Sequence, residues 1–402
     1  MKVPGCFFRS GRAPLRFYLP PFSMRPADSA VPARLVSLDV FRGLTVMLMT
    51  LVNNPGDWGH IYPPLEHAEW NGCTPTDLVF PFFLFIVGVS LAYALAGAKR
   101  SGAPLSPVVA KVARRAAILF GLGVLTSLYP RFDFATVRIM GVLQRIALVY
   151  FGCSVIYLNT GWRTQLTLLI IFLIGYAGLM QLVPVPGVGP ANLAPTTNLG
   201  AWLDRTLLTE PHLWPNSRTW DPEGVLGTLP ALGTGLLGLL AGQWLRWPGP
   251  TRLPKPAGLA LAGGLAVVLG LVWNTWFPIN KALWTSSFVL FTGGLALGLL
   301  ALLYWLCDVR GYRRGLGPVL AFGVNAIAVF FGSAILSRTF GLVQLPGPAG
   351  QPVGLTEWLY EWGIAPFFTD PRNASLAGAV VCLLIWLGVL SFLRRQNWVW
   401  KV

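Results

Sequence analysis

The chain has 402 residues, of which 54% are hydrophobic and only 11% are charged. Soluble proteins carry roughly 25% charged residues, so this composition excludes an ordinary soluble domain. A net charge of +15 would suggest nucleic-acid binding in a soluble protein. Here the basic residues lie in short loops between hydrophobic runs, which excludes nucleic acid as a partner and indicates a protein embedded in the lipid bilayer.

The hydrophobic pattern predicts an all-α, polytopic integral membrane bundle of about ten transmembrane helices, because each long run approaches the length that crosses a bilayer. The expected spans, in chain order, are 35–53, 76–97, 107–128, 138–158, 164–183, 224–245, 257–277, 284–307, 317–337 and 374–393. Residues 1–33 are rich in Pro and Arg and lack the apolar segment of a signal peptide. They are expected to form a disordered basic cytoplasmic tail, with the start at Met1 or Met24 left open.

The basic residues predict the orientation of these spans. Most of the 30 Lys and Arg residues fall on one side when the spans are threaded through a bilayer. Because positive loops stay inside, this side is cytoplasmic and so are both termini. The other side receives most acidic residues, all three histidines and three long loops, at 54–74, 184–223 and 338–373. Long loops on one face commonly carry function, so a polar substrate is expected on the outer side.

Two common kinds of site are excluded by the sequence pattern. The five cysteines are scattered and form no CxxC or Cys/His cluster, which indicates neither a metal site nor a disulfide framework. Glycine-rich strings such as "GTGLLGLLAG" follow no strand, so they are not the phosphate loops of a dinucleotide fold. They are typical of surfaces at which membrane helices pack closely.

The first outer loop contains the main candidate for catalysis, His67. This residue lies between Glu66 and Glu69, just before Trp70 and Asn71. Histidine is well suited to proton transfer near neutral pH, a neighbouring carboxylate can fix its tautomer, and an aromatic ring can form one wall of a sugar site. A solvated loop with an incidental histidine explains the same pattern equally well.

The segment "CTPTD" predicts the start of the second span. Thr74 suits the N-cap position, Pro75 suits the first helical position, and Asp77 falls in the first turn, where the helix dipole favours a carboxylate. Capping is therefore the expected main role of Asp77, which would hold the loop against the span that follows.

Charged residues also occur within the spans. Asp39 and Arg42 are three residues apart and share a helix face, and a second polar set comprises Arg138, Gln144 and Arg145. Charges at membrane depth usually face the bundle interior and are often functional. A structural ion pair is the alternative for Asp39 and Arg42. Arg145 has no acid close in sequence, so it requires a partner from another helix or an anionic ligand.

Further polar residues lie at the outer mouths of later spans. Asp221 suits an N-cap position, with Pro222 as the next residue, so capping competes with catalysis there. Asn280 and Lys281 precede the eighth span, and Asn325 is a lone amide within the ninth.

With these motifs placed, the chain resembles the transmembrane heparan-α-glucosaminide N-acetyltransferase family, and within it the bacterial NagX-like branch. The matching stretches run in order from Arg34 to Val329. They are "RLVSLDVFRGLTVMLMTLVNNPG", "LEHAEWNGCTPTDLVFPFFLFIVGVS", "VRIMGVLQRIAL", "DPEGVLGTLPA", "NKALWTSSFVL" and "GVNAIAVF". One departure is "RIMGVLQR", where the family usually has "RIPGVLQR"; it changes a helix start and no ionic group.

The resemblance implies an enzyme that moves acetyl from cytosolic acetyl-CoA to the amine of a glucosamine-type sugar on the periplasmic side. Residues 34–402 would form the transmembrane acyltransferase domain, located in a bacterial inner membrane. The family also implies a homodimer. Family motifs fall on His67 as the essential histidine, Asn53 near the acetyl group, the arginines Arg138 and Arg145, the acidic pair Asp221 and Glu223, and the pair Asn280 and Lys281.

This reading assigns the remaining site residues. His67 and Asn53 would be catalytic, supported by Asp77. The residues that would bind the sugar are Glu66, Trp70, Asn71, Asp221, Glu223, Asn280 and Lys281. The phosphates of CoA would meet basic groups, with Arg42, Arg114 and Arg115 as candidates beside Arg138, Gln144 and Arg145. No metal is expected. Direct transfer, with His67 as general base, is preferred over an acetyl-histidine intermediate, because no second base is obvious.

Two other functions compete with N-acetyl transfer. A transporter of amino sugars or muropeptide fragments would also place polar groups within spans, but the sequence has no paired interrupted helices in two matching halves. An O-acyltransferase acting on an envelope glycan would use the same donor. The sequence identifies neither the acceptor sugar nor the oligomeric state.

Overall fold

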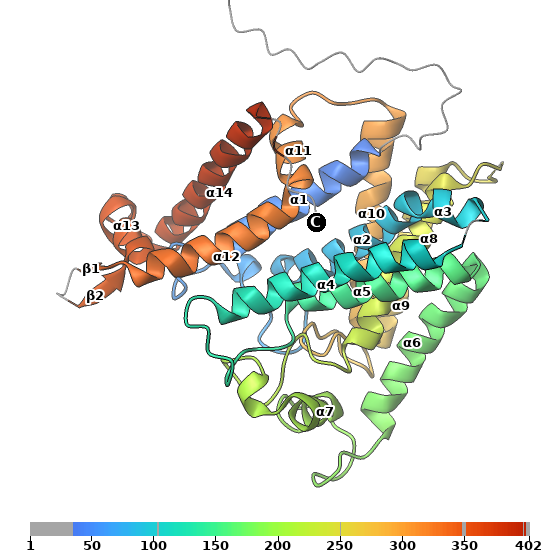
Figure 1. The fold of residues 1–402 in the computed structure, drawn as a ribbon, viewed down its shortest axis with the longest axis horizontal. Helices are drawn as coiled ribbons and strands as arrows, with labels where there is room; N and C mark the ends of the chain where they lie inside the picture. Colours follow the sequence, from blue (N-terminus) through green and yellow to red (C-terminus); the bar gives the residue numbers. More distant parts are fainter. Residues whose placement is uncertain (1–34, 103, 250, 348–350, 397, 399–402) are drawn as a thin grey trace, which may run out of the picture. The chain divides into compact units, whose positions relative to one another are not determined.

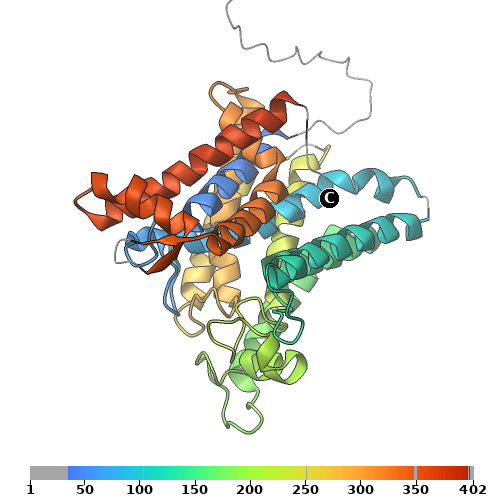
Figure 2. The ribbon, with the colours of Figure 1, turned by 60° about the vertical axis from the view of Figure 1, so that its left-hand side comes forward.

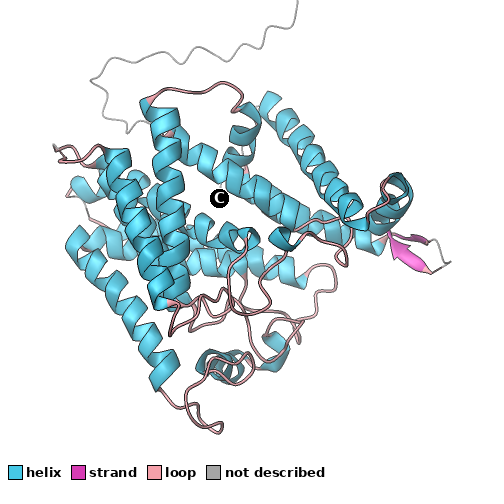
Figure 3. Ribbon diagram, turned by 180° about the vertical axis from the view of Figure 1, so that it is seen from behind, coloured by secondary structure: helices cyan, strands magenta, loops and turns pink. Residues whose placement is uncertain are grey.

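The computed structural model of the chain describes residues 35–102, 104–249, 251–347, 351–396 and 398. The predicted tail, 1–33, lies outside them. The described part is mostly helical, with one two-stranded hairpin that the all-α prediction did not include (Figures 1 and 3). The hairpin pairs β1 (Gln344–Pro346) with β2 (Pro352–Gly354) in antiparallel register, with Leu345 opposite Val353.

Helices occupy all the predicted span positions within the described residues. The long helices of the first half are α1 (Val36–Val52), α2 (Val79–Ala94), α4 (Ser106–Leu128), α5 (Val142–Asn159) and α6 (Trp162–Leu182). Those of the second half are α8 (Thr228–Arg246), α9 (Lys255–Trp273), α10 (Ser286–Tyr304), α11 (Gly317–Val324), α12 (Ala326–Leu342) and α14 (Pro371–Arg395).

Shorter elements connect them. These are η1 (Pro63–Leu65), η2 (Pro75–Leu78), α3 (Ala96–Arg100), α7 (Leu199–Leu208), η3 (Glu210–His212), the π-helical turn η4 (Trp305–Val309), α13 (Leu355–Gly363) and η5 (Ala365–Phe367). The loops before α2, α5, α8 and α10 gather at one end of the helices, where Gly72 N–H donates to Ile279 O (2.7 Å) and Ile139 N–H donates to His212 O (3.1 Å). Figure 3 shows this concentration of loops.

Six of the described helices are long and apolar enough to cross a membrane, or seven if α11 and α12 count as one bent span. α1 has only 17 residues, and α4 carries three basic residues, Lys111, Arg114 and Arg115. The described residues therefore form a helical membrane bundle, while the number of ten spans and the cytoplasmic placement of both termini stay predictions.

The ninth predicted span is not a single helix. α11 and α12 meet at Asn325 with a bend of 76°. The amide that the sequence placed in mid-span thus lies at a break, where Asn325 has φ −112° and ψ 30°, outside the helical region. Asn and Asp compete with the helix for backbone hydrogen bonds, which favours a break at this residue.

Glycines permit the closest helix contacts, as the sequence predicted. A Cβ atom on Gly88 of α2 would lie 2.0 Å from the carbonyl oxygen of Gly235 on α8, and one on Gly238 would meet the carbonyl oxygen of Phe85 at the same distance. Lipid is as apolar as these side chains, so close packing rather than the hydrophobic effect favours helix association in a membrane. The small residues of α2 and α8 therefore hold the centre of the bundle together.

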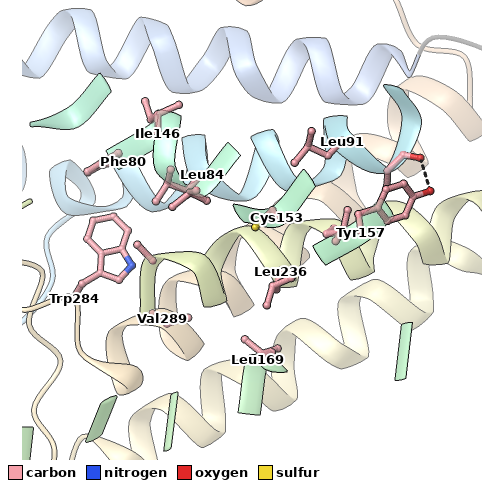
Figure 4. Packing of buried hydrophobic residues seen from close by; sticks show 14 of the residues in the cluster. Phe80, Leu84, Leu91, Ile146, Cys153, Tyr157, Leu169, Leu236, Trp284 and Val289 are labelled. Carbon is pink, nitrogen blue, oxygen red and sulfur yellow. Dashed lines mark hydrogen bonds between the residues drawn. The ribbon is translucent and has the colours of Figure 1, made fainter. Parts of the chain in front are cut away.

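The largest core cluster surrounds this contact. Leu84 of α2, Leu236 of α8 and Val289 of α10 are fully buried, and Ile146 of α5 packs with them (Figure 4). Trp284 belongs to this cluster and lies at the end of it nearest the loops. Its ring packs edge-to-face against Phe80, with a centroid distance of 4.9 Å. The core thus reaches the loops that form the site described below.

Replacing Gly88 tests the α2–α8 contact. Gly88→Ala should destabilise the fold by about 1–3 kcal/mol, because the added methyl overlaps backbone atoms that cannot rotate away. The measurement is thermal unfolding of the purified protein in detergent. Gly264→Ala on α9 is the matched control, since a Cβ there meets nothing within 4 Å and alanine is the better helix former by roughly 1 kcal/mol. Equal melting temperatures for the two variants would contradict this packing.

Candidate active site

The loop before α2 is folded around one carboxylate, that of Asp77. The Asp77 side chain is 1% exposed. Its Oδ2 accepts hydrogen bonds from Ala68 N–H (3.1 Å), Thr74 N–H (3.0 Å) and Thr74 Oγ1 (3.1 Å). Thr74 is the N-cap of η2 and Pro75 its first residue, so the predicted cap is confirmed. The second carboxylate oxygen, Oδ1, accepts none of these three hydrogen bonds.

The Oδ1 atom of Asp77 pairs with His67. Its Nδ1 lies 2.7 Å from Asp77 Oδ1. A carboxylate here fixes the tautomer that carries hydrogen on Nδ1 and leaves Nε2 as the acceptor. The ring itself is 54% exposed. The sequence pointed to the neighbouring glutamates for this role; instead the carboxylate comes from ten residues downstream, and Glu66 contributes its carbonyl oxygen to Thr74 Oγ1 (2.6 Å).

Lys281 completes a cluster of three. Its Nζ is 3.0 Å from Nδ1 and 3.2 Å from Nε2 of His67, and 3.3 Å from Asp77 Oδ1. An atom in the plane of the imidazole at these two distances would overlap a ring carbon, so Nζ lies over the ring face. Burial lowers the pKa of Lys281, while the charges of Asp77 and Glu223 act in the opposite direction.

A tight turn before α10 presents Lys281. Trp284, with φ 55°, donates its N–H to Lys281 O (3.0 Å), and its indole N–H donates to Thr234 Oγ1 (3.1 Å). Asn280 is fully buried and receives Leu283 N–H on its Oδ1 (2.8 Å). Its Nδ2 donates to Asn71 Oδ1 (3.2 Å). The two loops that carry His67 and Lys281 are therefore joined directly, which fixes the distance between these two groups.

Arg138 is held by the acidic pair at 221–223. Its Nε and Nη2 donate to the two carboxylate oxygens of Asp221 (2.8 and 2.6 Å), and Nη2 also pairs with Glu223. Asp221 does not cap α8 as predicted, because that helix starts only at Thr228. Burial raises the pKa of Asp221, and the hydrogen bond from Arg138 opposes this rise.

Arg145 is fully buried and supports the same turn. Its Nη1 and Nη2 donate to the carbonyl oxygens of Pro222 (3.0 Å) and Gly224 (2.9 Å). The guanidinium carbon lies 5.1 Å from the Trp284 ring centroid, a cation–π contact. The partners expected for the buried charge of Arg145 are thus two backbone carbonyls and an aromatic ring. Through these contacts Arg145 links the turn at 221–224 to the turn that carries Lys281.

Two other predicted residues, Asn53 and Trp70, lie around the loop. Asn53 is the exposed C-cap of α1, and among the described residues its side chain has no hydrogen bond to His67. Trp70 donates its indole N–H to Leu193 O (3.1 Å) and packs edge-to-face on Trp220, at 5.2 Å between centroids. One polar edge of Trp70 is therefore used to anchor the loop that precedes α7.

The predicted CoA ligands are spread over the bundle. Arg42 donates to Asp39 Oδ1, Gly323 O and Ser90 Oγ at 3.2–3.3 Å, next to the α11–α12 break. Arg114 and Arg115 are exposed on α4, and Arg115 also lies over the Tyr150 ring, 5.2 Å from its centroid. The structure thus separates Arg42, Arg114 and Arg115 from the cluster at His67.

Gln144 is buried between α4 and α5. The amide occupies space that Gly123 and Gly141 leave open, since a Cβ on either would come within 3 Å of its Oε1. Its Nε2 has no hydrogen-bond partner among the described residues. A buried donor without a partner costs about 1–3 kcal/mol, so this amide offers a place for a ligand carbonyl or an ordered water.

Known proteins were compared with the chain. The family model for the catalytic part of heparan-alpha-glucosaminide N-acetyltransferase matches residues 34–270. The chain belongs to this family.

Two curated members are heparan-alpha-glucosaminide N-acetyltransferases. The human protein is 28% identical over 428 aligned positions, covering 93% of this chain and 61% of the relative. The mouse protein is 28% identical over 425 positions, covering 92% and 60%. The chain therefore spans about three-fifths of the length of these relatives. A phospho-N-acetylmuramoyl-pentapeptide-transferase from Synechococcus is 30% identical over 191 positions, 40% of this chain and 52% of the relative.

Sequence reasoning missed Asp204, which lies on α7 and supports the turn before α8. It is almost fully buried, and its Oδ1 accepts Val225 N–H (2.8 Å). Burial raises the pKa of Asp204 to about 6; the charge of Asp221 adds to the rise and that of Arg145 opposes it. No local pattern identifies such a residue, because an isolated Asp on a short amphipathic helix is usually solvated.

The residues of the site support neither a cysteine nucleophile nor a metal centre as well as they support a histidine base. Burial raises the pKa of the Cys73 thiol to about 12, so Cys73 is not poised as a thiolate nucleophile. Within the described residues no group of three or more His, Cys, Asp or Glu side chains is arranged to hold a metal ion. The His67–Asp77–Lys281 cluster brings a histidine, a buried carboxylate and an amine within 3.3 Å of one another.

The buried carboxyl of Asp204 should make stability depend on pH. Its folded pKa of about 6 lies above the ordinary value of 3.8, so the folded state holds the proton more tightly. The resulting stabilisation is present below about pH 4 and is lost as pH rises through about 6. Asp204→Asn keeps the acceptor for Val225 and should remove this loss. Relative to wild type, the variant should gain on the order of 1 kcal/mol between about pH 5 and about pH 7. Parallel pH profiles of thermal unfolding for the two proteins would contradict the assignment.

Proposed function

We propose that the chain is a transmembrane N-acetyltransferase that moves acetyl from acetyl-CoA to the amine of a glucosamine-type sugar. The observation that carries this proposal is the His67–Asp77–Lys281 cluster in a family whose curated members are named as N-acetyltransferases. The donor would bind from the cytosol and the acceptor would approach from the periplasmic side of a bacterial inner membrane. A homodimer is carried over from the family resemblance.

In the proposed reaction the sugar amine attacks the thioester carbonyl carbon. The nitrogen lone pair forms the new C–N bond while the carbonyl π electrons move to oxygen. His67 Nε2 takes a proton from the amine nitrogen, and Asp77 stabilises the imidazolium that forms. Collapse of the tetrahedral intermediate expels the CoA sulfur, which recovers that proton as a thiol. The products are the N-acetyl sugar and CoA.

Two groups would stabilise the oxyanion of the intermediate. The Lys281 ammonium, 3.2 Å from His67 Nε2, would face the oxygen on which this charge develops. Asn53 would donate from its side-chain amide, a role that rests on the family resemblance. Direct transfer suits this arrangement, because the single acceptor nitrogen on His67 performs both proton transfers.

The remaining site residues divide between binding and support. We assign the acceptor to Glu66, Trp70, Asn71 and Asn280, which surround the cluster, with the exposed Glu66 carboxylate suited to attract a sugar ammonium. Arg138, Arg145, Asp221 and Glu223 bond one another or nearby carbonyls, so we assign them to holding the turn before α8. The CoA phosphates would use Arg114 and Arg115, with Arg42 closer to the thioester arm and Gln144 as a donor to an amide carbonyl of that arm.

Removing the base tests the function. His67→Ala should lower acetyl transfer at least about 10²-fold while acetyl-CoA binding is retained, because the ring is exposed and carries none of the phosphate contacts. Glucosamine-dependent CoA release and equilibrium binding of labelled acetyl-CoA measure the two properties. His60→Ala, in the same loop, is the matched control. Full turnover in His67→Ala would refute the assignment, and glucosamine flux into proteoliposomes without acetyl-CoA would support the transporter instead.

A separate prediction concerns the carboxylate behind the base. Asp77→Asn should lower kcat about 10²-fold or more, because an amide cannot fix the same tautomer or stabilise an imidazolium. KM for acetyl-CoA should change little. Asp57→Asn is the control, since Asp57 Oδ2 bonds His60 Nδ1 at 2.6 Å in the same loop. Similar losses in the two variants would mean that the loop structure, and not the chemistry at His67, is affected.

A further inference from the structure

The segment between the hairpin and α14 has a strongly amphipathic helix. In α13 the apolar residues recur at i, i+3, i+4 and i+7, which places them on one face. They are Leu355, Trp358, Leu359 and Trp362. Glu357 and Glu361 lie on the opposite face. This pattern is typical of a helix that lies at the boundary between an apolar and an aqueous phase.

The described part of the chain covers this apolar face only in part, since Leu355 and Trp358 are half-buried. Trp362 is 56% exposed, and Phe367 in the following turn is 79% exposed. Leu359 and Phe368 are also exposed. Four large apolar side chains on one short segment form a patch, and such patches mark interaction surfaces.

The position of the segment indicates what covers it. Three residues after Phe368, α14 begins at Pro371. The most apolar window of its stretch Pro371–Leu393 has a mean hydropathy of 2.6, with only 17% of that window buried within the protein. α14 therefore faces lipid over most of its surface. In Figure 2 the hairpin and α13 lie beside the start of the red α14. Aromatic side chains are enriched where a span enters the bilayer.

We propose that residues 355–368, which we call the aromatic corner, lie in the lipid–water interface and present Leu359, Trp362 and Phe367 to the bilayer. The corner continues the lipid-facing surface of α14, and its two glutamates point toward water. The occupant of the exposed patch is thus the membrane surface itself.

The loop that carries His67 is hydrogen-bonded to α14 and contacts the aromatic corner. Gly56 N–H donates to Ser375 O (3.0 Å), and Ser375 Oγ bonds both the N–H (3.1 Å) and the oxygen (2.7 Å) of Asp57. A Cβ on Gly56 would lie 2.4 Å from the Tyr360 ring. Because α13 and the first turn of α14 clamp this part of the loop, the depth of the corner also sets the height of the loop above the bilayer.

Nitroxide labels test the proposal directly. Single cysteines are placed at Leu359, Trp362 and Phe367 and, as the matched control, at Glu357 on the polar face of the same helix. Cys6, Cys73 and Cys382 are replaced by alanine, while the buried Cys153 and Cys307 are kept. The full-length protein is reconstituted in phosphatidylglycerol–phosphatidylcholine vesicles, and the collision rates of each label with oxygen and with a water-soluble nickel complex are compared.

We expect oxygen, which concentrates in lipid, to exceed the nickel complex several-fold at 359, 362 and 367, and the reverse at 357. Equal nickel access at all four positions would overturn the proposal. So would low access to both oxygen and the nickel complex at 362, because a second chain would then cover the patch. The Phe367 label lies outside α13 and replaces an exposed side chain, so it still gives a result if a label disturbs the helix.

Discussion

The geometry of the candidate site depends on the buried carboxylate of Asp77. One of its oxygens closes the loop by accepting two backbone N–H groups and a hydroxyl, and the other orients His67. A carboxylate that is removed from water needs several donors to offset its desolvation. The donors available at this place are the free N–H groups at the start of a helix and the His67 ring. The same carboxylate therefore caps the start of the second span and positions His67.

Two buried side chains, Arg145 and Trp284, hold the turn that carries Lys281. Lys281 can sit over the imidazole only if its turn is fixed, and Trp284 fixes it from the hydrophobic core. Arg145 lies against Trp284 on one side and the carbonyls at 222–224 on the other. Truncating a buried guanidinium with such partners leaves several carbonyls unsatisfied. Arg145 thus supports both the turn at 222–224 and the turn that carries Lys281, although it makes no hydrogen bond to His67 or Lys281 among the described residues.

The sequence predicted the helices well and the site only in part. Hydrophobic runs located every long helix, and the cap at Thr74 and Asp77 follows from local rules that the structure confirms. The bend at Asn325 was missed, because a single amide in a long apolar run does not alter its hydropathy. The contact of His67 with Lys281 joins residues 214 positions apart, and no local spacing encodes it. Only the family resemblance placed the two in one site, and it did not supply their geometry.

Two histidine–aspartate pairs in the same loop show what separates a candidate base from an ordinary surface pair. His60 with Asp57 and His67 with Asp77 have nearly the same distance, 2.6 and 2.7 Å, and similar ring exposure. The carboxylates differ: that of Asp57 is 35% exposed, whereas that of Asp77 is 1% exposed and also pairs with Lys281. Electrostatic interactions strengthen as the local dielectric falls, so the buried Asp77 carboxylate should hold the His67 ring more firmly than the partly exposed Asp57 carboxylate holds His60. The burial of the carboxylate, rather than the histidine or its hydrogen bond, is thus what distinguishes the His67 pair from the His60 pair.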